Sequence, residues 1–163
     1  APATGIKQEF HFLNLEGEMP YREMPIGLAL LACDTIIEDR RSGKKSLIGL
    51  FGQLNVTRLP CVHASLSLLV SLSGGCGEYS CEVMCANDAL ENPIFSVKGK
   101  VKLENPQQVL DMVFQLRAVK FPLAGLYWLK VLVDDIPLMM RPLIVTLRES
   151  SEEQPSAPNA GEA

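Results

Sequence analysis

The sequence predicts an all-β protein, an antiparallel immunoglobulin-like β-sandwich of about eight strands. The main observation is an alternation over residues 64–73, where apolar residues occupy every second position and serines occupy most of the others. Successive side chains leave a strand on opposite faces, so this pattern is typical of a half-buried strand. The same period recurs along most of the chain, with turn residues spaced as in a sandwich or barrel and no long helical stripe.

Length and composition limit the function classes. The 163 residues suit one domain with tails, and 47% hydrophobic with 21% charged residues is the balance of a folded globular protein. A formal net charge of -4 argues against general nucleic-acid binding, which needs a cationic surface. No apolar run reaches the roughly 20 residues that span a bilayer, so we expect no membrane partner.

The domain boundaries follow from changes in composition. We expect an N-terminal arm over residues 1–25 with a short strand at Glu9–Leu15, a sandwich over 26–147, and a flexible tail over 148–163 that lacks large apolar residues. The expected strands of the sandwich are 27–38, 45–56, 62–73, 77–86, 94–103, 108–118, 126–133 and 136–147.

Alternation also predicts which side chains face the core. Lys98, Lys100 and Lys102 should face water, because a shift of one residue would bury all three. The side chains expected to face inward are Ala64, Leu66, Leu68, Val70, Leu72, Phe95, Val97, Val101, Leu103, Leu110, Met112, Phe114, Leu116, Tyr127, Leu129, Val131 and Val133.

The segment Pro122–Tyr127 has the pattern of a corner between two sheets. In immunoglobulin-like sandwiches a tyrosine hydroxyl at this corner bonds back to the crossing backbone. We therefore expect the Tyr127 hydroxyl to bind the backbone a few residues upstream.

Four motifs occur in a fixed order along the chain. They are CDTIIE at 33–38, GKKSLIGLF at 43–51, FPLAGLY at 121–127 and VDD at 133–135. In these pieces the chain resembles an uncharacterised bacterial domain family of unknown function, over about residues 27–147. The resemblance implies a β-sandwich and brings no catalytic residues with it.

The five cysteines are an odd number in a chain that does not need disulfides to fold. We expect reduced thiols in a bacterial cytoplasm, buried as small hydrophobic residues. The residues are Cys33, Cys61, Cys76, Cys81 and Cys85.

Catalytic and metal sites have little support. Nucleophilic catalysis needs a histidine partner, and only His11 and His63 are available. Cys61 and His63 would share a strand face, but a cysteine and a histidine at the start of a strand are more often incidental neighbours. Cys81 and Cys85 would stand roughly 13 Å apart on a strand, too far to bind one zinc ion. We expect no enzyme activity, metal or cofactor.

Three charged features of the sequence have a structural interpretation that is simpler than a binding site. The segment Arg40–Ser46 lacks the first glycine and the following helix of a phosphate-binding loop, so we expect a charged hairpin tip. Asp34 lies in an apolar strand, and we expect it to accept hydrogen bonds from a turn or to pair with an arginine. Asp134 and Asp135 are expected to form a hairpin turn, because no third acidic ligand is spaced for calcium.

An outward apolar face is the strongest functional signal. If Tyr127 points inward, Leu126, Trp128 and Leu132 point outward, and a monomer rarely exposes a contiguous apolar patch. The N-terminal arm would cover this face through Phe10, Phe12 and Leu13, or another protein or subunit would.

We therefore expect a non-enzymatic interaction or assembly module that self-associates. The alternative is a small-ligand or carbohydrate binder in which Trp128 stacks on the ligand.

Overall fold

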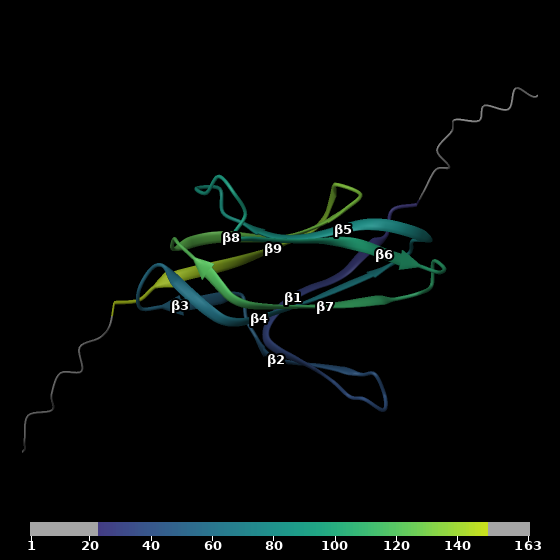
Figure 1. The fold of residues 1–163 in the computed structure, drawn as a ribbon, viewed down its shortest axis with the longest axis horizontal. Helices are drawn as coiled ribbons and strands as arrows, with labels where there is room; N and C mark the ends of the chain where they lie inside the picture. The colour runs from purple at the N-terminus through teal and green to yellow at the C-terminus, as the bar shows by residue number, and fades with distance from the viewer. Residues whose placement is uncertain (1–22, 150–163) are drawn as a thin grey trace, which may run out of the picture.

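The computed structural model describes residues 23–149, which form two β-sheets packed face to face (Figure 1). The all-β prediction is confirmed, with nine strands in place of about eight. No helix among the described residues is long and apolar enough to cross a membrane. The strands are β1 (Ile26–Glu38), β2 (Lys45–Leu50), β3 (Gln53–Val56), β4 (Cys61–Ser73), β5 (Gly77–Ala86), β6 (Phe95–Leu103), β7 (Leu110–Phe121), β8 (Gly125–Val133) and β9 (Ile136–Leu147).

The four-stranded sheet has the order β2-β1-β4-β7 and is antiparallel throughout. β1 pairs with β4 only as far as Cys33, and beyond that residue it pairs with β2 alone. The β1–β2 hairpin therefore projects away from the two packed sheets (Figure 1).

The five-stranded sheet has the order β3-β9-β8-β5-β6. Its strands pair antiparallel except β3 and β9, which are parallel. The expectation of a wholly antiparallel sandwich is therefore wrong for one pair. β5 and β8 lie inside this sheet with a strand on either side, which explains why their inward side chains are the most deeply buried.

The expected single strand 45–56 is wrong, because the chain crosses between the sheets at Phe51 and Gly52. The Phe51 amide donates to the Ala32 carbonyl (3.0 Å), while the Gly52 carbonyl accepts from the Ile144 amide (3.0 Å). Gly49 precedes the crossing with a φ of 72°, and a Cβ there would meet the Asp34 carboxylate at 2.3 Å. Only glycine fits that position, and its bend precedes the crossing that divides the pattern into β2 and β3.

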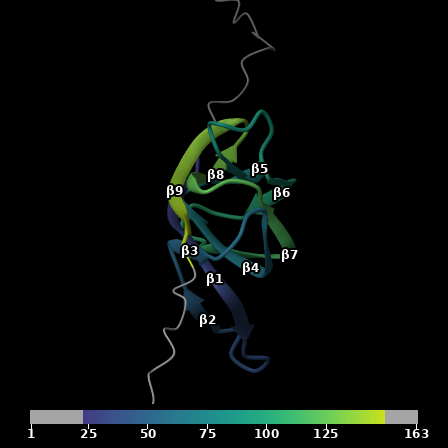
Figure 2. The same ribbon diagram turned by 90° about the vertical axis from the view of Figure 1, so that its left-hand side faces the viewer.

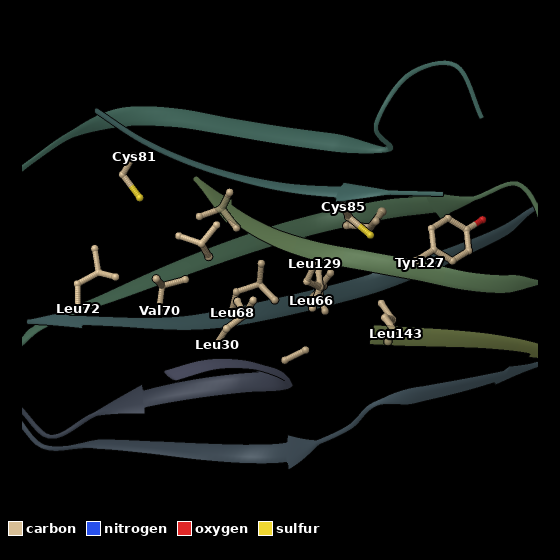
Figure 3. Close-up of a cluster of buried hydrophobic side chains, with 14 of the residues drawn as sticks. Leu30, Leu66, Leu68, Val70, Leu72, Cys81, Cys85, Tyr127, Leu129 and Leu143 are labelled. Atoms are coloured by element: carbon tan, nitrogen blue, oxygen red, sulfur yellow. The ribbon is translucent and has the colours of Figure 1, made fainter. Parts of the chain in front are cut away.

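The core lies between the sheets as one hydrophobic cluster (Figure 3). Most inward predictions are confirmed, and the side chains of β4 and β8 in this cluster are fully buried. The inward residues of β6 and β7 are mostly half-buried, since both are edge strands. The fully buried predicted residues are Leu66, Leu68, Val70, Leu72, Leu103, Tyr127, Leu129, Val131 and Val133.

The prediction for Ala64 is wrong, because its side chain is exposed. Ala64 lies between the register pairs His63↔Val119 and Ser65↔Arg117, opposite a left-handed residue, Ala118, with a φ of 53°. This local distortion changes which side chains face inward, so that Val119 and not Ala118 continues the core.

The serines of β4 behave less simply than alternation predicts. Ser67 and Ser71 are buried although they lie on the outer side of the sheet. β4 is flanked by β1 and β7, whose side chains cover them, and their hydroxyls donate to the Asp34 carbonyl (3.5 Å) and to the Asp111 carboxylate.

Both ends of the described chain are attached to the sandwich. The Glu23 carbonyl accepts a hydrogen bond from the Tyr79 hydroxyl (2.8 Å), and Pro25 is buried. The Arg148 amide donates to the Val56 carbonyl (2.7 Å), so the first residue of the expected tail still pairs with β3. The predicted strand Glu9–Leu15 and tail residues 150–163 lie outside the described residues.

Candidate functional site

The outer face of β8 and β9 carries a contiguous apolar patch. The register places Leu126 beside Ile144, Trp128 beside Pro142 and Lys130 beside Met140. Opposed residues on one sheet face have side chains in contact distance. We use the name apolar patch for Leu126, Trp128, Met140, Pro142 and Ile144, of which Leu126 and Ile144 are 44% exposed and Met140 is 51% exposed.

The corner before β8 determines which side chains form this patch. The Tyr127 hydroxyl donates to the Leu123 carbonyl (2.8 Å) and accepts from the Leu123 amide (3.2 Å), as predicted. Its ring is fully buried and meets Phe121 edge-on, with centroids 5.2 Å apart. Since Tyr127 is fixed inward, strand alternation turns Trp128 outward.

The three predicted interface residues differ in accessibility. Leu126 is exposed, whereas Trp128 and Leu132 are half-buried. Trp128 is flanked on its two sides by Ala86 and Pro142. Leu132 lies beyond a register shift, beside Glu82 and Pro137, at the far end of β8 from Leu126. The structure therefore joins Leu126 and Trp128 in one patch and leaves Leu132 at its margin.

The neighbouring half of the same sheet face is charged. Lys98 Nζ lies 3.7 Å from Glu82 Oε2 and 3.5 Å from Asp135 Oδ1, and the Ser96 hydroxyl donates to Glu82 (2.7 Å). Lys102 pairs with Glu104 at 3.2 Å. We call this surface the charged half, formed by Glu78, Glu82, Lys98, Lys100 and Lys102 on β5 and β6.

All five cysteines are free. Cys33, Cys81 and Cys85 are buried as expected, Cys61 is half-buried, and Cys76 is exposed, contrary to the expectation. Burial raises the pKa of Cys85 to about 12 and raises the pKa of Cys81 in the same direction. The thiols of Cys81 and Cys85 point into the core, where a protonated thiol serves as neither nucleophile nor metal ligand (Figure 3).

His63 has a different neighbour from the one that sequence spacing suggested. Its Nε2 lies 3.8 Å from Asp34 Oδ1, and its ring meets Phe51 edge-on at 5.5 Å. No hydrogen bond joins the Cys61 thiol to His63 within residues 23–149. The expectation that Asp34 would need compensation for burial is wrong, since its side chain is largely exposed where β1 leaves β4.

The predicted hairpin tip at Arg40–Ser46 connects β1 and β2. Its backbone amides at Arg41 and Ser42 donate to the Asp39 carboxylate at 2.7 and 2.8 Å. These two bonds hold the pKa of Asp39 below its ordinary value. The carboxylate takes the position that an anionic ligand of these amides would need.

The expected turn at Asp134 and Asp135 connects β8 and β9. Both residues have left-handed φ values, 49° and 64°, as a two-residue type I′ hairpin requires. The Asp134 carboxylate accepts from the Ser80 amide (2.9 Å), and Asp135 lies beside Lys98. The two carboxylates thus bind groups of this chain.

A family model matches residues 28–146, and its description is a family of unknown function, DUF6941. The chain belongs to DUF6941. The match agrees with the resemblance drawn from the four motifs, which covered about residues 27–147. No curated protein matches the sequence.

Among solved structures, the DUF6941 chain is similar to β-glucosidase from Listeria innocua, in complex with glucose and in complex with isofagomine. Both comparisons give a TM-score of 0.45 and 15% identity, and they cover 79% of this chain but 17% of the enzyme chain. The chain therefore spans only a minor part of that enzyme.

Sequence reasoning missed two hollows in the DUF6941 domain. One, of about 570 Å³, follows β3 and is lined by residues of the segment 54–63, among them Asn55, Arg58 and His63. The other, of about 380 Å³, lies between β6 and β7. Neither has a sequence motif, because each depends on how edge strands and loops are spaced in three dimensions.

Proposed function

We propose that this DUF6941 chain is a non-enzymatic interaction module that self-associates through the apolar patch. The observation that carries the proposal is Trp128, a half-buried indole among Leu126, Pro142 and Ile144 on an otherwise solvated surface. Tryptophan and methionine are enriched at interfaces, and an exposed apolar patch of this kind marks an interaction site.

The partner that we propose is a second copy of the chain. An apolar face of one sheet can pack on the apolar face of another, with the two sheets about 10 Å apart. A two-fold contact places the same patch on both subunits, so each Trp128 would be covered by apolar side chains of the other copy. The free cysteines support a reducing compartment, and we infer a cytoplasmic location.

The test is the effect of Trp128→Ala on molar mass in solution. Truncating an aromatic anchor at an interface centre costs about 2 kcal/mol or more, roughly a thirtyfold weaker self-association. Sedimentation equilibrium over low to high micromolar concentrations measures this change, and circular dichroism should stay unchanged because the inner face of β8 is intact. Leu50→Ala is the control, since Leu50 is an exposed leucine at 56% on the other sheet.

Two results would contradict the proposal. The first is a monomeric unmutated protein at high micromolar concentration. The second is a stronger effect of Leu50→Ala than of Trp128→Ala, which would move the contact to the β1–β2 hairpin.

The second candidate function is binding of a small ligand or carbohydrate. The hollow after β3 favours it, because Asn55, Thr57 and Arg58 offer polar groups beside apolar walls. A monomer that binds an oligosaccharide in calorimetry, with the binding lost in Arg58→Ala, would support this candidate over self-association.

A further inference from the structure

The two sheets leave an open groove along one side of the sandwich. Figure 2 shows β6 and β7 together on one side, and β9 and β3 on the other. The groove between β6 and β7 has a volume of about 380 Å³. Most of the lining residues are apolar, with Val97, Gly99 and Val101 on one side and Met112 and Phe114 on the other, and Lys98 and Lys100 also line it.

Gly99 leaves the groove unfilled at its centre. A Cβ added at Gly99 would meet no atom within 4 Å, so the space beside it is open. Its register partner Cys81 is buried and lines the same hollow. An apolar side chain entering here would therefore contact core residues.

The edges of the groove differ in their protection. β6 carries Lys98, Lys100 and Lys102 on its outer face, a common device against unwanted strand pairing. β7 is the outermost strand of its sheet and has no such run of lysines. Within residues 23–149 no strand pairs with the outer edge of β7, so the backbone groups on that edge can pair with one more strand.

The N-terminal segment leaves the sandwich at the end of this groove. The Glu23 carbonyl is bonded to the hydroxyl of Tyr79, and Tyr79 is the register partner of the groove residue Val101. Atoms of Pro25, Tyr79 and Leu103 all lie within 3.0 Å of where a Cβ of Gly75 would be. Residue 23 is therefore close to the point where β6 ends and β7 begins.

Only one of the two segments outside the described residues suits an apolar groove. Residues 150–163 contain no large apolar side chain. Residues 1–22 contain Phe10 and Phe12, which would share one face of an extended chain because they are two apart.

We propose that residues 9–15 of this chain occupy the groove in an extended conformation, with Phe10 and Phe12 inserted beside Gly99. From residue 23 the segment would run back along β7 and so pair with it antiparallel. Glu23 follows Phe12 by eleven positions, which span about 36 Å when extended, whereas Val101 and Val97 are about 13 Å apart. β5 and β8 separate β6 from β9, so this position leaves the apolar patch uncovered. Binding of residues 9–15 in the groove and self-association through the apolar patch would therefore use separate surfaces.

Amide hydrogen exchange of the full chain tests the proposal. Amides of residues 9–15 should exchange at least about tenfold more slowly than in a free peptide of the same sequence, at any protein concentration. Gly99→Leu fills the groove and should return them to the free-peptide rate. Gly52→Leu is the matched control, because Gly52 also has open space around its Cβ position and no left-handed φ.

Amides of β4 and β8 report in the same experiment that each variant is folded. Phe12→Asp disrupts the same contact by changing the N-terminal segment instead of the groove, and it should also abolish the protection. Free-peptide exchange in the unmutated chain would overturn the proposal. Protection that survives Gly99→Leu, or that appears only as concentration rises, would also overturn it, because the segment would then bind elsewhere or to a second copy.

Discussion

The apolar patch and the charged half lie on one face of one sheet, yet they present side chains of opposite polarity to solvent. On β6 the outward residues include Lys98, Lys100 and Lys102, and the first and last of these pair with nearby carboxylates. On β8 and β9 the outward residues are mostly apolar, and Lys130 is the only charged residue that the register places among them. Strands β5 and β8 are directly hydrogen-bonded, so the change occurs between two adjacent strands.

This difference separates folding from association. The core residues of β8 are fully buried on the inner face, so the apolar patch on the outer face is not needed to complete the sandwich. The proposed self-association would cover this apolar surface, which the fold itself leaves exposed. The inner side of β8 should therefore control stability, and its outer side should control self-association.

Leu129→Ala tests the inner side of β8 and should have the largest effect. Leu129 is fully buried, and truncation leaves a cavity that costs about 2–5 kcal/mol in the free energy of unfolding. Urea unfolding of dilute protein measures this loss. Leu126→Ala on the outer side should change the same free energy by no more than about 0.5 kcal/mol. Equal losses for the two variants would remove the distinction between the faces.

Cys85 tests the core beneath the boundary between the halves. Its folded pKa of about 12 exceeds the ordinary value of 9.0, so the unfolded chain loses this proton first. The free energy of unfolding should then fall as pH rises from about 9 toward 12, and Cys85→Ala should make the fall less steep. Denaturant titrations across this range measure the slope. Leu129→Ala, at a buried residue that does not titrate, should lower the free energy of unfolding but leave the slope as in the unmutated protein.

Lys98→Ala tests the charged half and should have the smallest effect. Lys98 is exposed and its ion pairs with Glu82 and Asp135 are at 3.7 and 3.5 Å. Exposed pairs contribute about 0–1 kcal/mol, so stability should change within that range and self-association should not change. A marked loss of self-association would extend the interface into the charged half.

Most of the fold was predictable because strand alternation is a local signal. The corner at Tyr127 and the turn at Asp134 and Asp135 were also predictable, since each depends on adjacent residues. The crossing at Phe51 and Gly52 was not, because only Gly49 and Gly52 interrupt residues 45–56 and the change of sheet depends on contacts with Ala32 and Ile144.

Only the part of the candidate site that follows from strand alternation was predictable. Trp128 and Leu126 follow from the orientation of Tyr127, whereas Ile144, Pro142 and Met140 join them through a register that is set in three dimensions. The proximity of His63 to Asp34 has no sequence signal, because it arises where β1 leaves β4.

The most direct test of the central claim uses Trp128 itself, the single tryptophan of the chain. Its emission spectrum and its quenching by acrylamide can be followed on dilution of the unmutated protein. Self-association through the apolar patch predicts a blue-shifted, poorly quenched indole at high concentration that becomes red-shifted and accessible over the same range in which the molar mass falls to that of one chain. A spectrum and quenching constant that do not change while the molar mass falls would contradict it.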